Sequence, residues 1–404
     1  MKLSHDQKPG ILEKEAFISD FVPMPAFELI PVFLSFASIL YMGTFIALLI
    51  GLSRTVSKHS LATPFVSIIV AARNEEHHLP GLLDCLLSQA YSNYEVIIVD
   101  DRSNDRTAEI VRSRQSAHRH LALISITSTN SDMPPKKSAL TKGIHTAKGE
   151  ILLFTDADCL PPPTWISEMT AGFDVMVGMV AGYSPYHHAS FGIEVRSVFQ
   201  KCFHAFIRYE ELKGSLWAAG SIGIGRGWLC TGRNLAYRRK VWDEVSGFEH
   251  IKHSVSGDDD LFLQLVQRTT TWGIRYITDP ATHVPTKPPE TAAEFVQQRT
   301  RHFSAGRFFS PSLKMFFVLF HGSNFLLYLG LAASFITPAF AWGLPLFLVK
   351  LVVDLIFLIV GSRTFGISPP VLFFPFMEIA LLLYNIIMGP LGALGSFTWK
   401  LDPK

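Results

Sequence analysis

The chain has 404 residues, enough for one large domain or two, and its formal net charge of +2 is too small to indicate a nucleic-acid partner. Hydrophobic residues make up 48% of it and charged residues only 17%, an apolar composition for a soluble protein. The apolar residues are concentrated near the N-terminus and in the last third, which is typical of a membrane protein with an aqueous domain in between. The four cysteines form no CxxC pair, so they predict neither a disulfide framework nor a zinc site.

A first membrane span is predicted at residues 29–53, which carry no charge and are long enough to cross roughly 30 Å of hydrocarbon. The segment begins too late in the chain, and is too long, for a cleaved signal peptide. Arg54 and Lys58 follow it, and positive charge favours the cytoplasmic side of a membrane. We therefore expect residues 1–28 to be extracytoplasmic and the central domain to be cytoplasmic.

The central domain, at residues 62–310, alternates short apolar runs with segments that have apolar residues at helical spacing. Strands are predicted within FVSIIVAARN, YEVIIVDDRS, LALISI and EILLFT, and helices within EEHHLPGLLDCLLSQA, DRTAEIVRSRQ and KKSALTKGIHTA. Strands that alternate with helices predict an α/β domain with a mostly parallel, Rossmann-like sheet and helices on both faces. In such sheets, ligands bind beyond the carboxyl ends of the strands.

Polar side chains follow three of the predicted strands. They are Arg73, Asn74 and Glu75 after the first strand, Asp100, Asp101 and Arg102 after the second, and Asp156 and Asp158 after the fourth. Since residues i and i+2 of an extended segment point the same way, both aspartates of the last pair can face one Mg²⁺ or Mn²⁺ ion, which would then meet a phosphate. For Asp100 and Asp101, a role as helix caps or turn residues is an equal alternative.

Two motifs of phosphate-binding loops are absent from the sequence. No GxGxxG follows the first predicted strand, and no GxxxxGK[ST] occurs anywhere. Their absence argues against a dinucleotide cofactor and against an ATP-hydrolysing loop, so a phosphate-bearing ligand would be held by a metal ion and side chains.

Two later segments of the domain have open alternatives. SGDDDLF places Asp258, Asp259 and Asp260 in a row, and mutual repulsion predicts a raised pKa for at least one, as suits a general base. The alternative is that they cap the helix LFLQLVQR. FGIEVRSVFQKCFHAFIRYEEL predicts either a helix at the membrane surface or an ordinary packed amphipathic helix.

The C-terminal third predicts further spans. No charged residue lies between Lys314 and Lys350, and Thr337-Pro338 divides that stretch, which gives spans at 315–337 and 339–361. The segment 371–397, which contains Glu378, is predicted to be a transmembrane or a re-entrant helix. Lys350 and Asp354 are spaced to neutralise each other on one helix face; alternatively they line a polar path or a lipid site with Glu378.

These segments together resemble a family 2 glycosyltransferase of the GT-A fold, over residues 64–308. VSIIVAARNEE, VIIVDDRSNDRT, KKSALTKGI and LLFTDADC resemble its first half, and CTGRNLAYRRKVWDEVSGF, SGDDDLFLQL and QQRTRHFSAGR resemble its second half in the expected order. The layout of one span before the domain and several after it is similar to the membrane-bound branch of cellulose-, hyaluronan- and poly-N-acetylglucosamine-synthase-like enzymes.

The resemblance implies a site for a sugar-nucleotide donor. Asp101 matches the aspartate that contacts the base or ribose of the nucleotide, and Asp100, Arg73, Glu75 and Lys137 are expected nearby.

The resemblance also implies a metal site. Asp156 and Asp158 match the DxD motif, whose second aspartate is the usual ligand of Mg²⁺ or Mn²⁺ and whose first lies at the donor. The metal ion would neutralise the leaving diphosphate as a Lewis acid.

The implied reaction is an inverting single displacement, which needs a base for the proton of the acceptor hydroxyl. The family pattern favours the second acid of its motif, so Asp259 is the expected base, with Asp258 next. Gly232 and Asn234, in TGRNLAYRR, are expected to form part of the acceptor wall; a tight turn before a helix is the alternative.

QQRTRHF resembles the QxxRW motif, which implies that Gln298, Arg301 and His302 lie at the acceptor and the leaving diphosphate. The fork of Arg301 suits a diphosphate. His302 stands where the family usually has Trp, a departure that weakens the expectation of long-chain, processive synthesis. As an alternative or additional role, Arg299, Arg301 and Arg307 could form a basic face on anionic lipid headgroups.

The sequence therefore predicts an integral membrane protein with a cytoplasmic, inverting glycosyltransferase domain. It would move a hexose from a nucleotide-sugar donor, expected to be a UDP-sugar, to a lipid or short glycan acceptor held at the membrane. The alternatives are a processive polysaccharide synthase of the same family, a membrane scaffold that keeps the fold without activity, and a transport protein built around the charges of the C-terminal spans.

Overall fold

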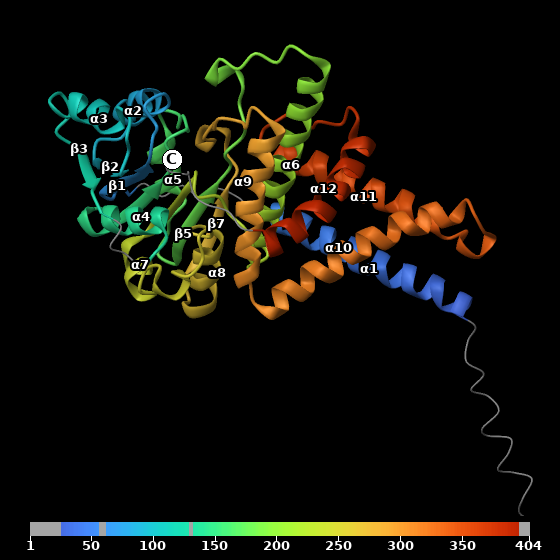
Figure 1. Cartoon of the computed structure of the whole chain (residues 1–404). Helices are drawn as coiled ribbons and strands as arrows, with labels where there is room; N and C mark the ends of the chain where they lie inside the picture. Colours follow the sequence, from blue (N-terminus) through green and yellow to red (C-terminus); the bar gives the residue numbers. More distant parts are fainter. Residues whose placement is uncertain (1–25, 56–61, 129–131, 396–404) are drawn as a thin grey trace, which may run out of the picture. The chain divides into compact units, whose positions relative to one another are not determined.

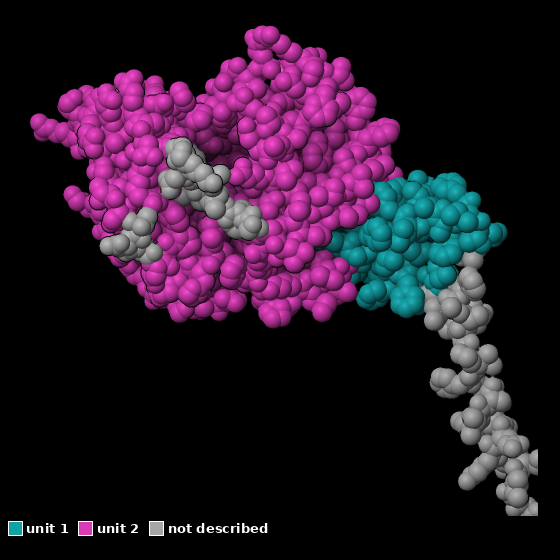
Figure 2. Space-filling view, in the orientation of Figure 1, with its two compact units in different colours: residues 1–41, 320–350 teal, residues 42–319, 351–404 magenta. Residues whose placement is uncertain are grey.

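The computed structural model describes residues 26–55, 62–128 and 132–395, so most of the predicted N-terminal segment 1–28 lies outside the described residues. The chain divides into two compact units, which Figure 2 distinguishes by colour. The smaller unit is formed by residues 1–41 and 320–350, and the larger by residues 42–319 and 351–404.

A seven-stranded sheet lies at the centre of the larger unit, with the strand order β3-β2-β1-β4-β6-β5-β7 (Figure 1). The strands are β1 (Val66–Ala72), β2 (Tyr94–Asp101), β3 (Leu121–Ile126), β4 (Ile151–Phe154), β5 (Val177–Gly182), β6 (Leu235–Arg238) and β7 (Gly273–Ile277). Strand β6 is antiparallel to both neighbours, β4 and β5, and every other pair is parallel. The predicted mostly parallel sheet is confirmed, and its first four strands fall within the predicted segments.

Helices of the larger unit cover both faces of the sheet. They are α2 (Leu79–Leu87), α3 (Thr107–Gln115), α4 (Pro135–Thr146), α5 (Trp165–Ala171), α6 (Val198–Gly223), α7 (Arg239–Glu244), α8 (Asp260–Thr269) and α9 (Ala292–Ser304), with 3-10 turns η1 (Ala189–Phe191), η2 (Glu249–Ile251), η3 (Pro280–Thr282) and η4 (Ala305–Phe308). Strand β1 shows how alternation produces two faces. Ile68 and Val70 join a core cluster with Leu82 of α2, whereas Ile69 faces α4 so closely that a Cβ on Gly143 would lie 2.6 Å from its Cγ2 atom.

Four helices in the described part of the chain are long and apolar enough to cross a membrane. They are α1 (Ala26–Leu52), α10 (Pro311–Ser334), α11 (Gly343–Thr364) and α12 (Phe374–Leu394). Each overlaps one of the predicted segments 29–53, 315–337, 339–361 and 371–397, and together they indicate a membrane protein. A further turn, η5 (Pro338–Phe340), separates α10 from α11.

The smaller unit packs the ends of these helices against one another. A Cβ on Gly343 of α11 would lie 2.0 Å from the carbonyl oxygen of Gly330 in α10, so the two backbones touch. Lys350 is buried, with its Nζ 4.7 Å from the ring centroid of Tyr328. Asp354, one turn further along α11, is buried as well, and its predicted pairing with Lys350 stays a prediction.

Candidate active site

The loops that follow β1 and β2 are held together by reciprocal hydrogen bonds. Asn74 and Arg102 adopt positive φ angles of 53° and 56°, a conformation that persists in non-glycine residues only where the surroundings determine it. The Asn74 backbone N–H donates to Ser103 Oγ at 2.9 Å, and the Asn104 N–H donates to Asn74 Oδ1 at 2.9 Å. The carboxyl ends of the two parallel strands therefore form one rigid rim.

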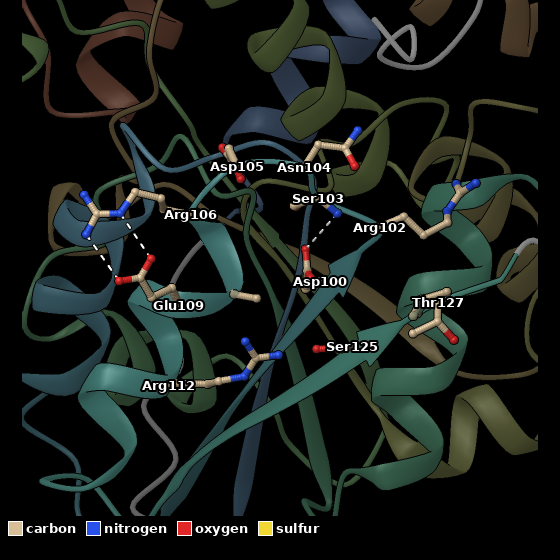
Figure 3. Close-up of a pocket in the computed structure, with 12 residues that line it drawn as sticks. Asp100, Arg102, Ser103, Asn104, Asp105, Arg106, Glu109, Arg112, Ser125 and Thr127 are labelled. Atoms are coloured by element: carbon tan, nitrogen blue, oxygen red, sulfur yellow. Dashed lines mark hydrogen bonds and ion pairs between the residues drawn. The ribbon is translucent and has the colours of Figure 1, made fainter.

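A pocket of about 640 Å³ opens on this rim, lined by residues of β2, α3 and β3 and of the loops that join them (Figure 3). Asp100 lies in its wall, where its Oδ1 accepts the Ser103 N–H at 3.3 Å. Asp101 instead points into a two-pronged ion pair with Arg102, with Nε–Oδ1 and Nη2–Oδ2 distances of 2.8 and 3.1 Å. Of Asp100 and Asp101, both predicted to bind the donor, the structure thus places Asp100 in the pocket lining.

The other predicted donor-binding residues on this side follow β1. Arg73 is buried at the strand end, and the Glu75 carboxylate lies 2.9 Å from His78 Nδ1. Strand β1 pairs in parallel with β4, so the loop after β1 reaches the aspartates that follow β4. The charge of Glu75 is one of the causes that raise the pKa of Asp158.

The centre of the site is a lysine between two carboxylates. Lys136 Nζ, at the start of α4, lies 3.1 Å from Asp156 Oδ1 and 3.0 Å from Asp258 Oδ2. These three side chains line one small cavity together with Gly232 and Tyr237. The structure therefore brings the first aspartate of the predicted metal pair and one aspartate of the SGDDDLF segment to the same lysine.

The antiparallel strand β6 explains why segments so distant in sequence meet here. Its register pairs Phe154 with Leu235, so the start of β6 lies beside the end of β4, where the aspartate pair follows. Gly232 precedes β6 by three residues, and its backbone N–H donates to Asp259 Oδ2 at 2.9 Å. The turn before β6 thus holds the aspartates of SGDDDLF against the end of β4.

The three consecutive aspartates have different surroundings. Asp258 faces Lys136, whereas Asp259 is the N-cap of α8 and accepts the Asp260 N–H at 2.8 Å. Asp260 accepts the Cys230 N–H at 2.7 Å. Burial, followed by the charges of neighbouring aspartates, raises the pKa of Asp259 and of Asp260, as the sequence predicts for such a run. The geometry places Asp258 in the cavity and uses Asp259, the base favoured by the sequence, to hold backbone N–H groups.

Lys137, predicted to lie near the nucleotide, is fully buried under a loop. Its Nζ donates to the carbonyl oxygens of Ile251, Ser254 and Ser256 at 2.7, 2.7 and 3.1 Å. That loop leads directly into the run of aspartates, so the hydrogen bonds of Lys137 stabilise the loop that positions them. Sequence reasoning missed Lys136, because adjacent residues on a helix point about 100° apart and nothing local shows which one faces a site.

The aspartates after β4 fit a divalent cation. Burial raises the pKa of Asp158, and the charges of Asp156 and Glu75 add to that shift, so negative charge is poorly compensated there. Burial alone would also raise the pKa of Asp156, but the adjacent Lys136 lowers it. No three His, Cys, Asp or Glu side chains of the described residues are gathered to hold a metal by themselves. A bound Mg²⁺ or Mn²⁺ would take its remaining ligands from a diphosphate and water, as such ions usually do.

Helix α9 brings the predicted acceptor residues to the same region. Gln298 Oε1 accepts the Tyr186 hydroxyl at 2.8 Å, and His302 Nδ1 lies 3.3 Å from Arg299 Nη1. Burial, followed by the charges of Arg299 and Arg301, lowers the pKa of His302 well below its usual range, so the imidazole is neutral. Arg301 is close enough to the central cluster for its charge to lower the pKa of Lys136 and that of Asp156.

Arg233 is a site residue that sequence reasoning missed. Its guanidinium carbon lies 5.3 Å from the ring centroid of Tyr186, and its Nη2 lies 3.8 Å from Glu211 Oε1. Its charge lowers the pKa of Asp158 and of Asp156, so it acts on both aspartates of the predicted metal pair. The TGRN turn contains this residue, but a lone Arg in a turn has no spacing pattern that would single it out.

Asn234, by contrast, points into the protein rather than into the cavity. Its Nδ2 donates to the carbonyl oxygens of Tyr183 and Thr282, both at 2.8 Å, and its Oδ1 accepts the Trp165 indole N–H at 2.9 Å. The side chain therefore ties β6 to the adjacent segments, and of the two predicted acceptor-wall residues only Gly232 lines the cavity.

Comparison with known proteins identifies the family. Residues 151–388, more than half of the chain, match the sequence profile described as glycosyl transferase family group 2, and residues 67–229 match that of glycosyl transferase family 2. Glycosyltransferase AglE of Haloferax volcanii is 35% identical over 105 residues, 26% of this chain and 33% of AglE. The undecaprenyl-phosphate 4-deoxy-4-formamido-L-arabinose transferase of Aeromonas hydrophila is 31% identical over 118 residues, 28% of this chain and 35% of that protein.

The chain thus spans about a third of the length of these two curated relatives. Among solved structures, the mannosyltransferase PcManGT from Pyrobaculum calidifontis, in complex with GDP-Man and Mn²⁺, is 22% identical, with a TM-score of 0.49 over 89% of this chain and 96% of that one. The profile matches include Asp156 and Asp258 of the cavity and helix α9. The chain belongs to the family 2 glycosyltransferases, and its mostly parallel sheet with helices on both faces is their GT-A fold.

Proposed function

We propose that the chain is an inverting glycosyltransferase that moves a hexose from a nucleotide-sugar donor to an acceptor held at the membrane. The observation that carries the proposal is the cavity in which Lys136 lies between Asp156 and Asp258. Such a displacement needs a carboxylate pair that binds the metal ion and the diphosphate, and a separate carboxylate that takes the proton of the acceptor. Packing alone has no need to assemble them around a partly buried lysine.

Asp258 is the group we assign as general base, ahead of the Asp259 expected from the sequence. Its carboxylate lines the cavity, whereas both oxygens of Asp259 accept backbone N–H groups. In the reaction, the acceptor oxygen forms a bond to the anomeric carbon while the bond from that carbon to the diphosphate breaks. Asp258 takes the acceptor proton, and the nucleoside diphosphate leaves from the opposite face of the sugar.

The donor would lie along the rim formed by the ends of β1, β2 and β4. Its nucleotide would occupy the pocket beside Asp100 and Asp101, with Arg73 and Glu75 at its edge, and a UDP-sugar is the donor that we expect. A Mg²⁺ or Mn²⁺ ion held by Asp158 would supply Lewis-acid stabilisation of the diphosphate. The remaining proposed residues for the donor and acceptor are those of the cavity and of α9, together with Arg233; they are Asp156, Lys136, Gly232, Gln298, Arg301 and His302.

A membrane lipid or a short glycan attached to one is the acceptor that we propose, with the catalytic domain in the cytoplasm. The Aeromonas hydrophila relative is, by its name, an undecaprenyl-phosphate transferase. The apolar helices α1, α10 and α11 lie directly before and after the catalytic domain in the chain, so an acceptor in the bilayer would be held near the cavity. A neutral His302 in place of Trp favours this reading over processive polysaccharide synthesis, which is the second candidate. Membership of the cellulose- and hyaluronan-synthase-like branch stays a prediction.

The test uses purified full-length protein in vesicles of native lipid. A panel of UDP- and GDP-sugars is offered with Mn²⁺, Mg²⁺ or EDTA, and both nucleotide release and the transfer of labelled sugar into lipid extract or polymer are measured. We expect metal-dependent release from one donor, lost in Asp158→Ala. Labelled polymer instead of labelled lipid would favour the processive synthase. An absence of both release and nucleotide binding in a folded protein would refute the proposal in favour of a scaffold.

A further inference from the structure

Helix α12 is apolar and long enough for a span, but its two faces differ in what they contact. One face is buried against the catalytic domain, and the buried positions are Phe374, Glu378, Tyr384, Met388 and Gly392. The opposite face exposes large apolar side chains at helical spacing, namely Phe376, Ile379, Leu383, Ile387, Leu391 and Leu394. Figure 1 shows α12 beside α6 and α9, with which it makes its helix–helix contacts in the larger unit.

The first turns of α12 are fixed to α6 of the catalytic domain. Glu378 Oε1 lies 2.9 Å from Lys213 Nζ, and the hydroxyl of Tyr209 donates to the same carboxylate. All three side chains are buried. The sequence left Glu378 without a partner among the spans; the structure supplies one from a helix of the aqueous domain, so the start of α12 lies at that domain.

The middle and the end of α12 are fixed to α6, α9 and η4. The Tyr384 hydroxyl donates to Glu210 Oε1 at 2.9 Å, and its ring centroid lies 5.8 Å from that of Phe303. At Gly392 the backbones of α12 and α9 are so close that a Cβ on this glycine would lie 2.3 Å from Phe303 Cβ. Arg307 Nε donates to the Gly392 carbonyl oxygen at 2.9 Å, four residues before α10 begins. The end of α12 therefore also lies at the catalytic domain.

A helix that touches the catalytic domain along its whole length cannot cross the hydrocarbon core. From Glu378 to Gly392, α12 extends about 21 Å at 1.5 Å per residue. Along this length its partner α9 carries Glu294, Arg299 and Arg301, charges that hydrocarbon does not accommodate. The preceding helix α11 already ends at this domain, because the rings of Phe365 and Tyr276 stack there with centroids 5.8 Å apart.

We infer that α12 lies in the plane of the membrane surface and that the described part of the chain crosses the bilayer three times, through α1, α10 and α11. The partner of the exposed apolar face is the lipid bilayer. That face carries no charge, and the buried face of the same helix is joined at Gly392 to Arg307, four residues before the spanning helix α10 begins. The described end of the chain at residue 395 then lies on the same side as the catalytic domain. If the proposed function holds, the acceptor residues of α9 lie at the level of the lipid headgroups.

The first test maps the side of the membrane on which the chain ends, and it needs no catalytic activity. One full-length protein carries an epitope tag after Lys404, and a second carries the tag between Ala341 and Trp342, in the turn that joins α10 to α11. Protease is added to vesicles of either orientation. We expect the C-terminal tag to be lost from the side on which the catalytic domain is digested and the internal tag from the other side. Loss of both tags from one side would overturn the inference.

The second test measures depth along the exposed face. Nitroxide labels are attached in turn to Phe376→Cys, Leu383→Cys and Leu391→Cys, in a Cys202→Ser background because Cys202 is exposed. The outer two positions are about 22 Å apart along the helix axis. A helix in the membrane plane gives all three labels the same ratio of collisions with oxygen and with a water-soluble nickel complex. A label at Leu383→Cys that lies about 10 Å deeper than the other two would show a spanning helix and contradict the inference.

Discussion

Replacing Lys137 by Met tests whether this lysine supports the aspartate loop or binds the nucleotide. The substitution keeps most of the buried apolar stem but removes three hydrogen bonds, to the carbonyl oxygens of Ile251, Ser254 and Ser256. Hydrogen bonds from a charged group contribute about 1.5–3 kcal/mol each, and the cost of burying the ammonium offsets much of that sum. Because three buried acceptors lose their donor, we expect a net loss of about 3–5 kcal/mol in the free energy of unfolding.

The assay is thermal melting of the detergent-solubilised protein, followed by Trp fluorescence, with nucleotide binding measured on the same samples. The expected loss corresponds to a fall in Tm of about 6–20 °C for a domain of this size. Lys142→Met is the matched control, because Lys142 is exposed on the same helix and the same substitution there should change the Tm little. An unchanged Tm in Lys137→Met together with weaker nucleotide binding would refute the loop-supporting role and restore the predicted contact with the donor.

Three further outcomes are expected. Asp258→Asn should lower kcat at least about 100-fold, with nucleotide affinity retained in calorimetry. Asp259→Asn should chiefly lower the free energy of unfolding, by about 1–3 kcal/mol, and with it the Tm. Equal losses of kcat in the two variants, with unchanged melting, would contradict this assignment. Burial raises the pKa of Glu211 from its usual 4.5 to about 7, so the native state binds the extra proton between these pH values and stability falls as pH rises through them. The free energy of unfolding should therefore fall between pH 4.5 and 8 by about 3 kcal/mol less in Glu211→Gln than in the parent protein. Chemical denaturation at several pH values measures this difference. Gly51→Ala should lower the Tm, because the new Cβ would lie 1.8 Å from a backbone oxygen of α6, while Gly43→Ala on the same helix meets no neighbour within 4 Å and should leave it unchanged.

The first four strands could be predicted because they contain apolar runs rich in Ile, Leu and Val. The later strands could not, since β5, β6 and β7 contain Gly, Arg or Tyr at positions that match no period. The antiparallel direction of β6 is set by tertiary pairing with β4 and has no local signal. Yet that direction is what brings the turn at Gly232 to the end of β4.

Within the site, residue types could be predicted better than individual residues. The acidic pair after β4 follows from its position at a strand end, and the structure places Asp156 in the cavity. In the Lys136–Lys137 pair and in the run of aspartates, neighbouring residues have the same chemistry, so their sequence could not distinguish the one that faces the cavity from the one that holds the backbone. That choice depends on the rotation of α4 and on the cap of α8, which tertiary contacts determine.

Lys213 has a consequence for the order in which the chain assembles. This one ammonium pairs with Glu378 of α12 and lies 5.4 and 5.8 Å from the ring centroids of Phe45 in α1 and Phe357 in α11. Two of these three partners are synthesised long after Lys213 itself, and Glu378 follows it by 165 residues. Until then the lysine has no counter-ion among these contacts, so the catalytic domain would emerge before the carboxylate that pairs with this ammonium. The docking of α12 would then take place on a domain that has already folded, and a chain that stops before residue 374 would retain this charge without its carboxylate.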